Sequence, residues 1–428
     1  MNSTFEERMR ESVNRPRIYF DHAATTLPRP EVIDTVATLL KESYGNPSSF
    51  YQEGHRAAEL LEDARARIAA CLDVHPEEIF FTSCGTESDN WAIKGTADAH
   101  RRRGRHIITT TIEHHAVLHS MEALEREGFD VTYLDVDHRG ILEPEKVREA
   151  LRDDTILVSV MMANNEIGTI QPIKVIGSIC REAGVLLHSD GVQALGAIPV
   201  NPNELNADMM SFSGHKLYAP KGIGLLYKRK GVRIDRLIDG GAQEKRQRGG
   251  TENVTYAVAL AKALEMSLAD MEKESKRQTA LRDRLIHGVI ERIPHTKLNG
   301  HATERLPNNA NFSFEFIEGE SILLFLDKFG YACSSGSACT SASLDPSHVL
   351  LAIGLPAEIA HGSLRVTLGI DSTDEQINHF LIDLPLIVER LRDMSPLYSD
   401  YKRGVLPSLI PEEGSLDLEI AGGYGWSS

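Results

Sequence analysis

A lysine and an aspartate stand at the ends of two apolar runs of the sequence. Lys216 follows ADMMSFSG (207–214), and Asp190 lies in VLLHSDG (185–191). A lysine at the end of a buried strand is costly to keep charged, and such an amine is suited to forming a Schiff base. An aspartate in that place can pair with a pyridinium nitrogen. Each has a plainer explanation, a surface lysine in a turn and a helix N-cap. Together, with one strand between them, they fit around a single pyridoxal phosphate ring.

A third group, TSCGTES (82–88), has the composition of a phosphate site. It follows the apolar run EIFF and precedes a helical pattern. Gly85 permits a close approach of the backbone, and the free N–H groups of a helix start, with the hydroxyl of Thr86, bind anions. Ser213 and His215 are placed to donate to the same phosphate. The alternative is an ordinary helix-capping segment.

Three further residues follow other expected strands. His114 ends HIITTTIEH (106–114) and could stack on a pyridine ring and move protons near neutral pH. Asn165 offers an amide donor, and Arg365 could fork onto a substrate carboxylate. The plainer explanations are a structural histidine and a structural salt bridge. Ligands bind at the carboxyl ends of strands in open parallel sheets, so we expect these residues to converge there.

The most distinctive stretch is ACSSGSACTSAS (332–343). Small polar residues do not pack a core, and Gly and Ser favour mobility. An exposed free cysteine is a liability unless it is used. Cys339 on a mobile arm could attack a substrate in one place and deliver a product in another. A flexible linker with an incidental cysteine is the alternative. Cys333, directly after an apolar run, is expected to be buried.

These residues need a scaffold, and the apolar pattern predicts one. Short strand-like runs alternate with amphipathic helical patterns from about residue 20 to 230, which indicates an α/β domain with a mostly parallel sheet. The last two runs are separated mainly by HKLYAPK (215–221), too short for a helical crossover, so they should form an antiparallel pair. The expected strands are 78–85, 106–114, 130–137, 155–164, 185–191, 207–214 and 222–229.

The rest of the chain predicts a second, smaller unit. One long helical pattern covers 255–293, and mixed strands and helices follow it. We expect a large cofactor-binding domain at 19–260 and a small α+β domain made of 1–18 and 261–404, which carries the cysteine stretch. The segment 405–428 has no clear periodicity, and we expect a flexible tail.

Composition excludes several classes of function. The chain has 428 residues, 46 Lys+Arg and 62 Asp+Glu, for a formal net charge of −16. Such acidity disfavours nonspecific binding to nucleic acid or to an anionic membrane. No apolar run is long enough to span a bilayer, and the acidic N-terminus resembles neither a secretory signal nor a transit peptide. Five cysteines without zinc-type spacing favour a reducing cytoplasm and predict no metal site of the chain's own.

Eleven segments, in order, resemble the PLP-dependent cysteine desulfurases of the NifS/IscS type, within the class-V aminotransferase group. The resemblance runs from Tyr19 to Gly404, and the long arm around Cys339 is similar to that of group I. It implies fold type I, with a large domain around a mostly parallel seven-stranded sheet and a smaller α+β domain. The segments are DHAATT (21–26), YGNPSS (44–49), TSCGTESDN (82–90), IEHHAVL (112–118), NNEIGTIQP (164–172), HSDGVQ (188–193), SFSGHKLYAPKGIG (211–224), RGGTEN (248–253), RLPNNANFSF (305–314), SSGSACTSASLDPSHVL (334–350) and HGSLRVTLG (361–369).

Matching positions imply the site roles. Lys216 would hold pyridoxal phosphate as a Schiff base and remove the α-proton of L-cysteine, and Cys339 would accept the sulfur as a persulfide, leaving L-alanine. Thr251 would reach the phosphate of a neighbouring subunit in a homodimer. The other implied roles are Asp190 at the pyridine nitrogen, Gln193 at the phenolic oxygen, His114 stacked on the ring, Gly85, Thr86, Ser213 and His215 at the phosphate, and Asn165 and Arg365 at the substrate carboxylate.

The resemblance also implies a sulfur acceptor, such as an iron–sulfur scaffold, to whose cluster Cys339 could bind. The segment 395–405 is similar to the family's scaffold-contacting end. Two positions depart from the pattern: Cys84 stands where Gly or Ala is commoner, and His22 where Asn is usual. A selenocysteine lyase or related β-lyase is the alternative enzyme, and a catalytically silent assembly platform is the alternative outside catalysis.

Overall fold

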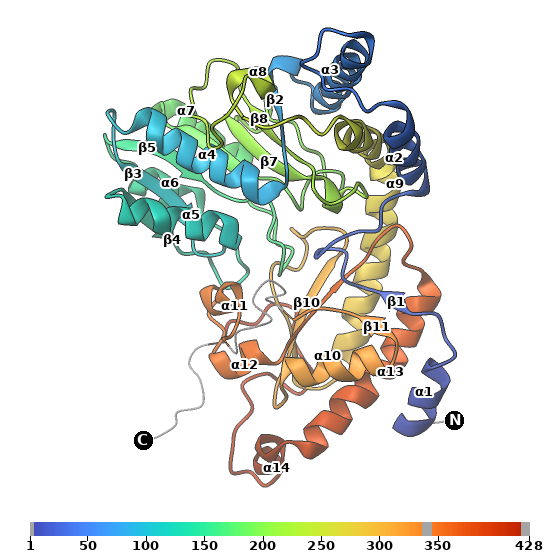
Figure 1. The fold of residues 1–428 in the computed structure, drawn as a ribbon. Coiled ribbons are helices and arrows are strands. Elements are labelled where there is room, and N and C mark those ends of the chain that lie inside the picture. The colour runs from blue at the N-terminus through green and yellow to red at the C-terminus, as the bar shows by residue number, and fades with distance from the viewer. Residues whose placement is uncertain (1–3, 336–344, 421–428) are drawn as a thin grey trace.

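The computed structural model describes residues 4–335 and 345–420 (Figure 1). Its centre is a seven-stranded sheet in the order β2-β8-β7-β6-β5-β3-β4. Neighbouring strands from β7 to β4 are parallel, whereas β8 is antiparallel to both β7 and β2. The predicted mostly parallel sheet and the antiparallel pair are therefore confirmed. The strands are β2 (Ile79–Thr82), β3 (His106–Thr110), β4 (Asp130–Leu134), β5 (Thr155–Ser159), β6 (Leu186–Asp190), β7 (Met209–Ser213) and β8 (Gly224–Lys228).

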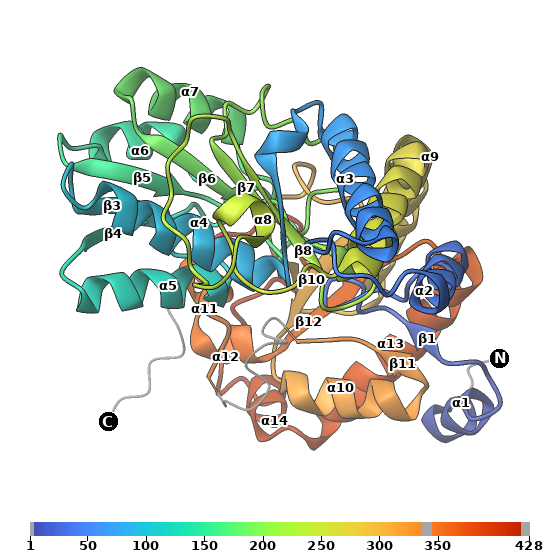
Figure 2. The same cartoon turned by 45° about the horizontal axis from the view of Figure 1, so that its top comes forward.

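Helices cover both faces of this sheet (Figure 2). On one face, α4 and α5 pack over the strands through an apolar cluster that includes Trp91 and Met121. On the other face a larger cluster joins the sheet to α3, α7 and α9. β5, β7 and β8 are buried along their whole length, as expected for strands that have helices on both faces of the sheet. The helices are α2 (Pro30–Glu42), α3 (Gln52–Leu72), η1 (Pro76–Glu78), α4 (Gly85–His100), α5 (His115–Arg126), α6 (Pro144–Ala150), α7 (Ile173–Ala183), η2 (Gly214–Lys216) and α8 (Gln243–Arg246).

One long helix, α9 (Val254–Arg292), connects the sheet to the rest of the molecule (Figure 1). Its first part, which includes Leu260 and Leu264, packs in the core of the large sheet. Its last part, which includes Leu285 and Val289, packs in a second core. A single helix thus belongs to two hydrophobic cores, although the exact division into domains stays a prediction.

The second core lies between two small sheets and their helices. A three-stranded antiparallel sheet has the order β12-β10-β9, and a parallel pair joins β1 to β11. The N-terminal helix α1 packs against α13. The elements are α1 (Phe5–Ser12), β1 (Ile18–Tyr19), β9 (Thr296–Leu298), β10 (Asn309–Phe314), α10 (Gly319–Lys328), β11 (Tyr331–Ala332), α11 (His348–Ala352), α12 (Ala357–His361), β12 (Ser363–Thr367), α13 (Asp374–Met394) and α14 (Pro396–Lys402).

The segment 405–420 lies against both parts of the molecule. Ser415 forms a parallel bridge with Lys297 on the open edge of β9. Asp417 pairs with His138 of the large domain at 2.9 Å. Ile410 is fully buried. Among the described helices, none is both long and apolar enough to span a membrane.

Candidate active site

A cavity of about 330 Å³ opens between the carboxyl end of the sheet and the small domain. It brings together ten of the twelve site residues that the sequence singled out. Thr251 is exposed and does not line this cavity. Cys339 lies outside the described residues. The ten are Gly85, Thr86, His114, Asn165, Asp190, Gln193, Ser213, His215, Lys216 and Arg365.

Lys216 reaches the cavity on a tight turn. The strand β7 ends at Ser213, and the single turn η2 brings the lysine back toward the N-terminal segment. Lys216 Nζ donates to the carbonyl oxygens of Ala23 and, at 2.6 Å, of Ala24. Gln193 Nε2 donates to the same Ala23 oxygen at 3.0 Å. Two backbone carbonyls therefore fix where the amine lies.

Asp190 is buried at the end of β6. Its Oδ1 accepts from the N–H of Val192 at 2.9 Å. Burial raises the pKa of Asp190 to about 6, although the Val192 bond and the positive Lys216 both oppose that rise. A protonated ring nitrogen beside Asp190 would place a positive charge next to the carboxylate. That charge would favour the ionised form of Asp190, which burial disfavours.

A buried polar network lies next to Asp190. His188 makes 2.9 Å hydrogen bonds to the hydroxyls of Ser159 and Ser211. Burial lowers the pKa of His188 to about 3, so its ring is neutral. Asp89 is fully buried, and its burial together with the negative Asp190 raises its pKa well above the ordinary value.

His114 is oriented by the helix that follows it. Its Nδ1 accepts from the N–H of Ala116 at 3.1 Å and caps α5. Because Nδ1 is an acceptor, a neutral ring carries its proton on Nε2. Burial, together with the positive Lys216, lowers the pKa of His114 to about 4. The imidazole therefore stays neutral at neutral pH.

The start of α4 has the features of a phosphate site. Cys84, the N-cap, makes no side-chain capping bond, so the first N–H groups of this 16-residue helix lack that partner. The hydroxyl of Ser213 is buried without a hydrogen-bond partner among the described residues. A Cβ on Gly85 would meet Val192 Cγ2 at 2.8 Å, so only glycine leaves this approach open. The free N–H groups and the Ser213 hydroxyl can donate to a phosphate, Gly85 leaves room for it, and the positive end of the helix dipole favours its charge.

Arg365 on β12 and Asn165 in the loop after β5 meet at the cavity. Arg365 Nη1 donates to the Asn165 carbonyl at 3.0 Å, and its Nη2 pairs with Asp21 at 2.9 Å. Its Nε is buried without a hydrogen-bond partner among the described residues. Ser334 donates to the other Asp21 oxygen at 2.7 Å. The structure therefore places this guanidinium where a substrate carboxylate could exchange for Asp21.

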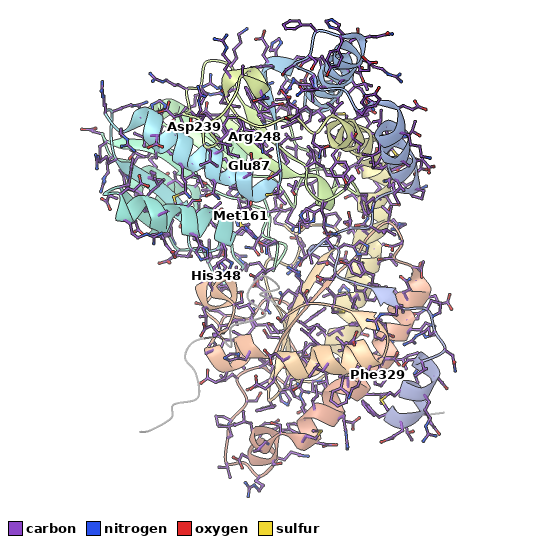
Figure 3. All side chains as sticks on the ribbon, viewed as in Figure 1. Glu87, Met161, Asp239, Arg248, Phe329 and His348 are labelled. Atoms are coloured by element: carbon purple, nitrogen blue, oxygen red, sulfur yellow. The ribbon has the colours of Figure 1, made fainter. Side chains whose placement is uncertain are left out.

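The loop that carries Thr251 is fixed beside α4. Arg248 forks onto Glu87 at 2.7 and 3.1 Å, and Figure 3 labels both side chains. Glu244 forks onto Arg65 at 2.9 and 3.0 Å, and both of these side chains are buried. Thr251 itself faces outward.

The described cysteines differ in their surroundings. Cys333 is partly buried against the small-domain core, and burial raises its pKa well above the ordinary value. Cys84 lines the cavity. Cys71 and Cys180 are free and lie in helices α3 and α7. Among the described residues, no group of three or more His, Cys, Asp or Glu is arranged to hold a metal.

Known proteins are similar to this chain over most of its length. The family model for class-V aminotransferases matches residues 18–380. The chain belongs to the class-V aminotransferase family. A cysteine desulfurase IscS of Methanosarcina thermophila is 53% identical over 386 residues, which cover 90% of this chain and 95% of that protein. A cysteine desulfurase IscS of Clostridium botulinum is 51% identical over 389 residues, covering 90% and 98%.

Solved structures extend the comparison to the fold. A NifS-like protein superposes with a TM-score of 0.83 at 39% identity, covering 88% of this chain and all of that one. A structure titled SspA in complex with cysteine has a TM-score of 0.73 at 36% identity, covering 82% and 98%. This class-V aminotransferase is therefore similar in sequence to proteins named cysteine desulfurase and in structure to a NifS-like protein.

Several cavity residues of this class-V aminotransferase were missed from the sequence. Ala23 and Ala24 act through backbone carbonyls, which carry no side-chain signal. Glu166 accepts from Ser347 at 2.5 Å, and His348 bonds the Glu113 carbonyl at 2.9 Å. Both contacts join the small domain to loops after β3 and β5, and only the fold brings them together. In the sequence, the only signs of these two residues were the glutamate in NNEIG (164–168) and the histidine in DPSHVL (345–350).

Proposed function

We propose that this protein is a pyridoxal phosphate-dependent cysteine desulfurase that moves the sulfur of L-cysteine to Cys339 and releases L-alanine. The observation that carries the proposal is the convergence of Lys216, Asp190 and His114 on one cavity beside an uncapped helix start. Relatives about half identical to this chain bear the cysteine desulfurase name, and a structural relative was solved with cysteine.

The residues present fit the cofactor. Lys216 would bind its aldehyde carbon, Asp190 its ring nitrogen, and the α4 start with Ser213 its phosphate. His114 and Gln193 would contact the ring face and the phenolic oxygen. When bound, pyridoxal phosphate supplies an electron sink for the α-carbon of an amino acid.

The chain's own groups then handle the substrate. Arg365 and Asn165 would hold the carboxylate of L-cysteine, and that charge-assisted fork fixes which face of the α-carbon points at Lys216. Lys216 Nζ would take the α-proton, with the carbonyls of Ala23 and Ala24 holding the protonated amine. His114 is neutral and carries its proton on Nε2, so it would donate a hydrogen bond to the bound group without adding a positive charge.

The sulfur step uses a thiolate. Cys339 Sγ attacks the sulfur of the substrate, an S–S bond forms, and the C–S bond breaks. The electron pair of that bond stays with the carbon, which takes up a proton to become the methyl group of alanine. The products, L-alanine and a cysteine persulfide, contain all the atoms of L-cysteine and the Cys339 thiol. An acceptor thiol, such as one on an iron–sulfur scaffold, then removes the outer sulfur.

A homodimer fits the exposed surface. Thr251 is exposed on a loop that Arg248 ties to Glu87 of α4, and it would reach the phosphate of a second subunit. Large apolar side chains are exposed on α2 and the loop between α2 and α3, although such residues are normally covered. They are Ile33, Leu40, Tyr44, Phe50 and Tyr51, of which Phe50 is 95% exposed.

Alanine and persulfide formation test the proposal directly. Wild-type enzyme with L-cysteine should release alanine and gain the mass of one sulfur atom at Cys339. Cys339→Ala should still change the cofactor absorbance on adding L-cysteine but form almost no alanine. Cys71→Ala, a remote thiol, is the matched control and should turn over normally. Normal turnover by Cys339→Ala, or a strong preference for L-selenocysteine, contradicts the proposal.

A further inference from the structure

Two buried serines stand on either side of the stretch that carries Cys339. Ser334 precedes it and Ser347 follows it. Ser334 comes shortly after β11, whose Tyr331 packs in the second core. Ser347 is the N-cap of α11, whose Leu350 packs in the core of the large sheet. The two ends of the stretch therefore belong to different hydrophobic cores.

Ser347 is attached to a carboxyl group at the cavity. Its hydroxyl donates to Glu166 Oε2 at 2.5 Å and accepts from the Leu350 N–H at 3.3 Å. Glu166 is buried and lines the cavity. Its backbone is fixed, because its N–H donates to Asn164 Oδ1 at 2.8 Å and its carbonyl accepts from two asparagine side chains of β10. The end of the stretch is thus held by a hydrogen bond between two buried groups.

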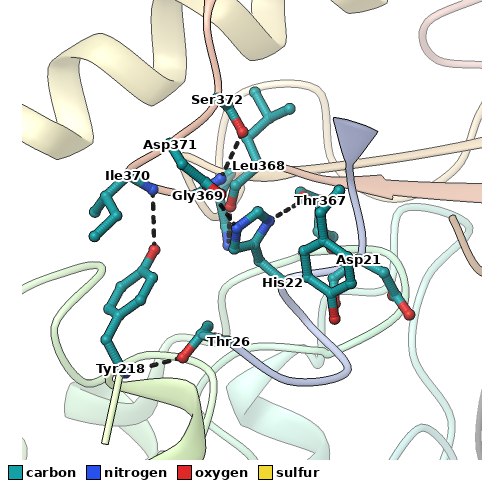
Figure 4. A network of polar contacts seen from close by, with 12 residues as sticks. Asp21, His22, Thr26, Tyr218, Thr367, Leu368, Gly369, Ile370, Asp371 and Ser372 are labelled. Atoms are coloured by element: carbon teal, nitrogen blue, oxygen red, sulfur yellow. Dashed lines mark hydrogen bonds and ion pairs between the residues drawn. The ribbon is translucent and has the colours of Figure 1, made fainter. Parts of the chain in front are cut away.

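Ser334 is attached to a carboxylate in the same way. Its hydroxyl donates to Asp21 Oδ2 at 2.7 Å, and its carbonyl accepts from the Arg365 N–H at 2.7 Å. Asp21 forms a parallel bridge with Thr367, and Figure 4 labels both residues. The other oxygen of Asp21, Oδ1, pairs with Arg365 Nη2 at 2.9 Å. A substrate carboxylate that replaced Oδ1 on the guanidinium would therefore leave the Ser334 contact in place.

Arg365 lies between the two attachments. Its Nη2 contacts Asp21 directly, and its Nη1 donates to the carbonyl of Asn165, the residue before Glu166. The positive Arg365 also opposes the rise in the pKa of Glu166, to about 7, that burial causes. A carboxyl group keeps an accepting oxygen whether or not it is ionised, so the Ser347 bond does not depend on the charge of Glu166. The guanidinium thus connects both ends of the cysteine stretch.

We propose that Asp21 and Glu166 are positioning residues that, through Ser334 and Ser347, fix both ends of the cysteine stretch relative to Arg365. Two sulfur atoms must meet in a defined geometry for the thiol to attack, and fixed ends limit the positions that Cys339 can take. The effect on turnover rests on the proposed function, whereas the two attachments do not.

Hydrogen exchange on the full chain tests the attachments without the reaction. Glu166→Ala removes the acceptor of the Ser347 hydroxyl and should speed exchange at 347–350 by about tenfold, the value of one hydrogen bond. Glu166→Gln keeps an accepting oxygen and should exchange as slowly as the wild type. Ser334→Ala should speed exchange of the Arg365 N–H, which donates to the carbonyl of residue 334. Exchange at the wild-type rate in Glu166→Ala or in Ser334→Ala overturns the attachment that the variant removes.

Kinetics of Ser334→Ala and Ser347→Ala test the positioning role, because each removes a hydroxyl and leaves the side chain of Arg365 with its partners. We expect kcat for alanine release to fall about tenfold or more in each variant. KM for L-cysteine and the change in cofactor absorbance should stay as in the wild type, because a misplaced thiol slows chemistry and not binding. Ser12→Ala is the matched control and should turn over normally, since this buried hydroxyl donates to the Met9 carbonyl in α1. An unchanged kcat, or a raised KM in its place, overturns the positioning role.

A double variant tests whether Glu166 and Ser347 act through one contact. Glu166→Ala and Ser347→Ala remove the same hydrogen bond, so kcat of the double variant should be close to that of the slower single variant. Glu166→Gln should keep most of the wild-type kcat, because the amide oxygen still accepts from Ser347. A double variant whose loss is the product of the two single losses overturns the coupling. The expected hydrogen exchange in a protein whose wild type releases no alanine contradicts the proposed function alone.

Discussion

The Ser213 side chain at the cavity has a polar group that the protein itself does not satisfy, unlike most buried polar groups. Its hydroxyl is buried without a partner among the described residues, which in a protein interior costs free energy until a partner arrives. Ser213→Ala should weaken pyridoxal phosphate binding by about tenfold or more, the value of one hydrogen bond to a charged group. The free energy of unfolding of the cofactor-free protein should not fall. Titration of the cofactor into apoprotein, with thermal unfolding beside it, measures both.

Ser189 gives the matched control. Its hydroxyl is also buried without a partner among the described residues, but it does not line the cavity. Ser189→Ala should leave the affinity for pyridoxal phosphate unchanged. Equal losses of affinity in the two variants would mean that the Ser213 hydroxyl does not contact the phosphate.

Glu113 should make stability depend on pH. Burial raises its pKa from the ordinary 4.5 to about 8, against hydrogen bonds from Thr110 and the Met161 N–H. The folded state therefore binds this proton more tightly than the unfolded state. The contribution is fully present below about pH 4.5 and is lost as pH rises through 8, at up to about 1.4 kcal/mol per pH unit.

Glu113→Gln should flatten this fall, because the amide keeps the accepting oxygen and does not ionise. The unfolding midpoint measured from pH 5 to 9 checks the slope. Glu59→Gln, an exposed site on α3, should keep the wild-type profile. If Glu113→Gln retained the wild-type slope, the pH dependence would belong to another group.

The sequence predicted the reacting side chains but not their supports. Lys216, Asp190 and His114 have reactive side chains and follow apolar runs, so the sequence predicted both their chemistry and their position. The carbonyls of Ala23 and Ala24 belong to the backbone, so no side chain in the sequence indicates their role. The two hydrogen-bond partners of His22, the Thr367 carbonyl and the Asp371 carboxylate, lie more than 340 positions away in sequence. Only the folded contacts reveal such partners.

At the scale of elements, the start of α4 must approach the sheet closely. Gly85→Ala would bring a Cβ to 2.8 Å from Val192 Cγ2, and overpacking of this kind costs about 1–3 kcal/mol. The helix start should shift, and the affinity for pyridoxal phosphate should fall. Titration of apoprotein with the cofactor measures the loss.

Val192→Ala removes the obstructing methyl group and should restore much of that affinity in the double variant. The nearest remaining atom, Ser213 Cβ, is 3.4 Å from the added carbon, an ordinary contact. A double variant as weak as Gly85→Ala alone would show that the glycine serves the backbone conformation and not the space beside Val192.

Connection length and periodicity were enough to predict most elements. The seven strands of the main sheet and the long helix fall where the apolar pattern placed them, and the short link after β7 required an antiparallel β8. The segment after α14 gave no such pattern. Ser415 pairs with the edge of β9, and pairing of an extended segment depends on the partner strand more than on its own residues.

At the scale of the whole molecule, segment 405–420 joins the two domains. Its backbone N–H groups at Leu409 and Ile410, with the Ser408 hydroxyl, donate to the buried carboxylate of Glu315. A chain ending at Val405 would remove all three donors. Each lost partner of a buried charged group costs about 1–3 kcal/mol, so the unfolding midpoint should fall markedly.

Hydrogen exchange locates the effect. The Leu298 N–H donates to the Ser415 carbonyl at 2.9 Å and should exchange much faster in the shortened chain. A chain ending at Ile420 keeps every one of these contacts and is the control. Unchanged exchange at Leu298 in the chain that ends at Val405 would mean that the edge of β9 is protected without the segment.

The edge of β9 has a consequence for how the protein is made. Residues 405–420 follow β9 and Glu315 in the chain, so they emerge from the ribosome after both. Until they emerge, the strand edge at Thr296–Leu298 has no cover from this segment, and Glu315 does not yet accept from Ser408, Leu409 and Ile410. The nascent chain therefore exposes a template for unwanted strand pairing until residues 405–420 can cover it.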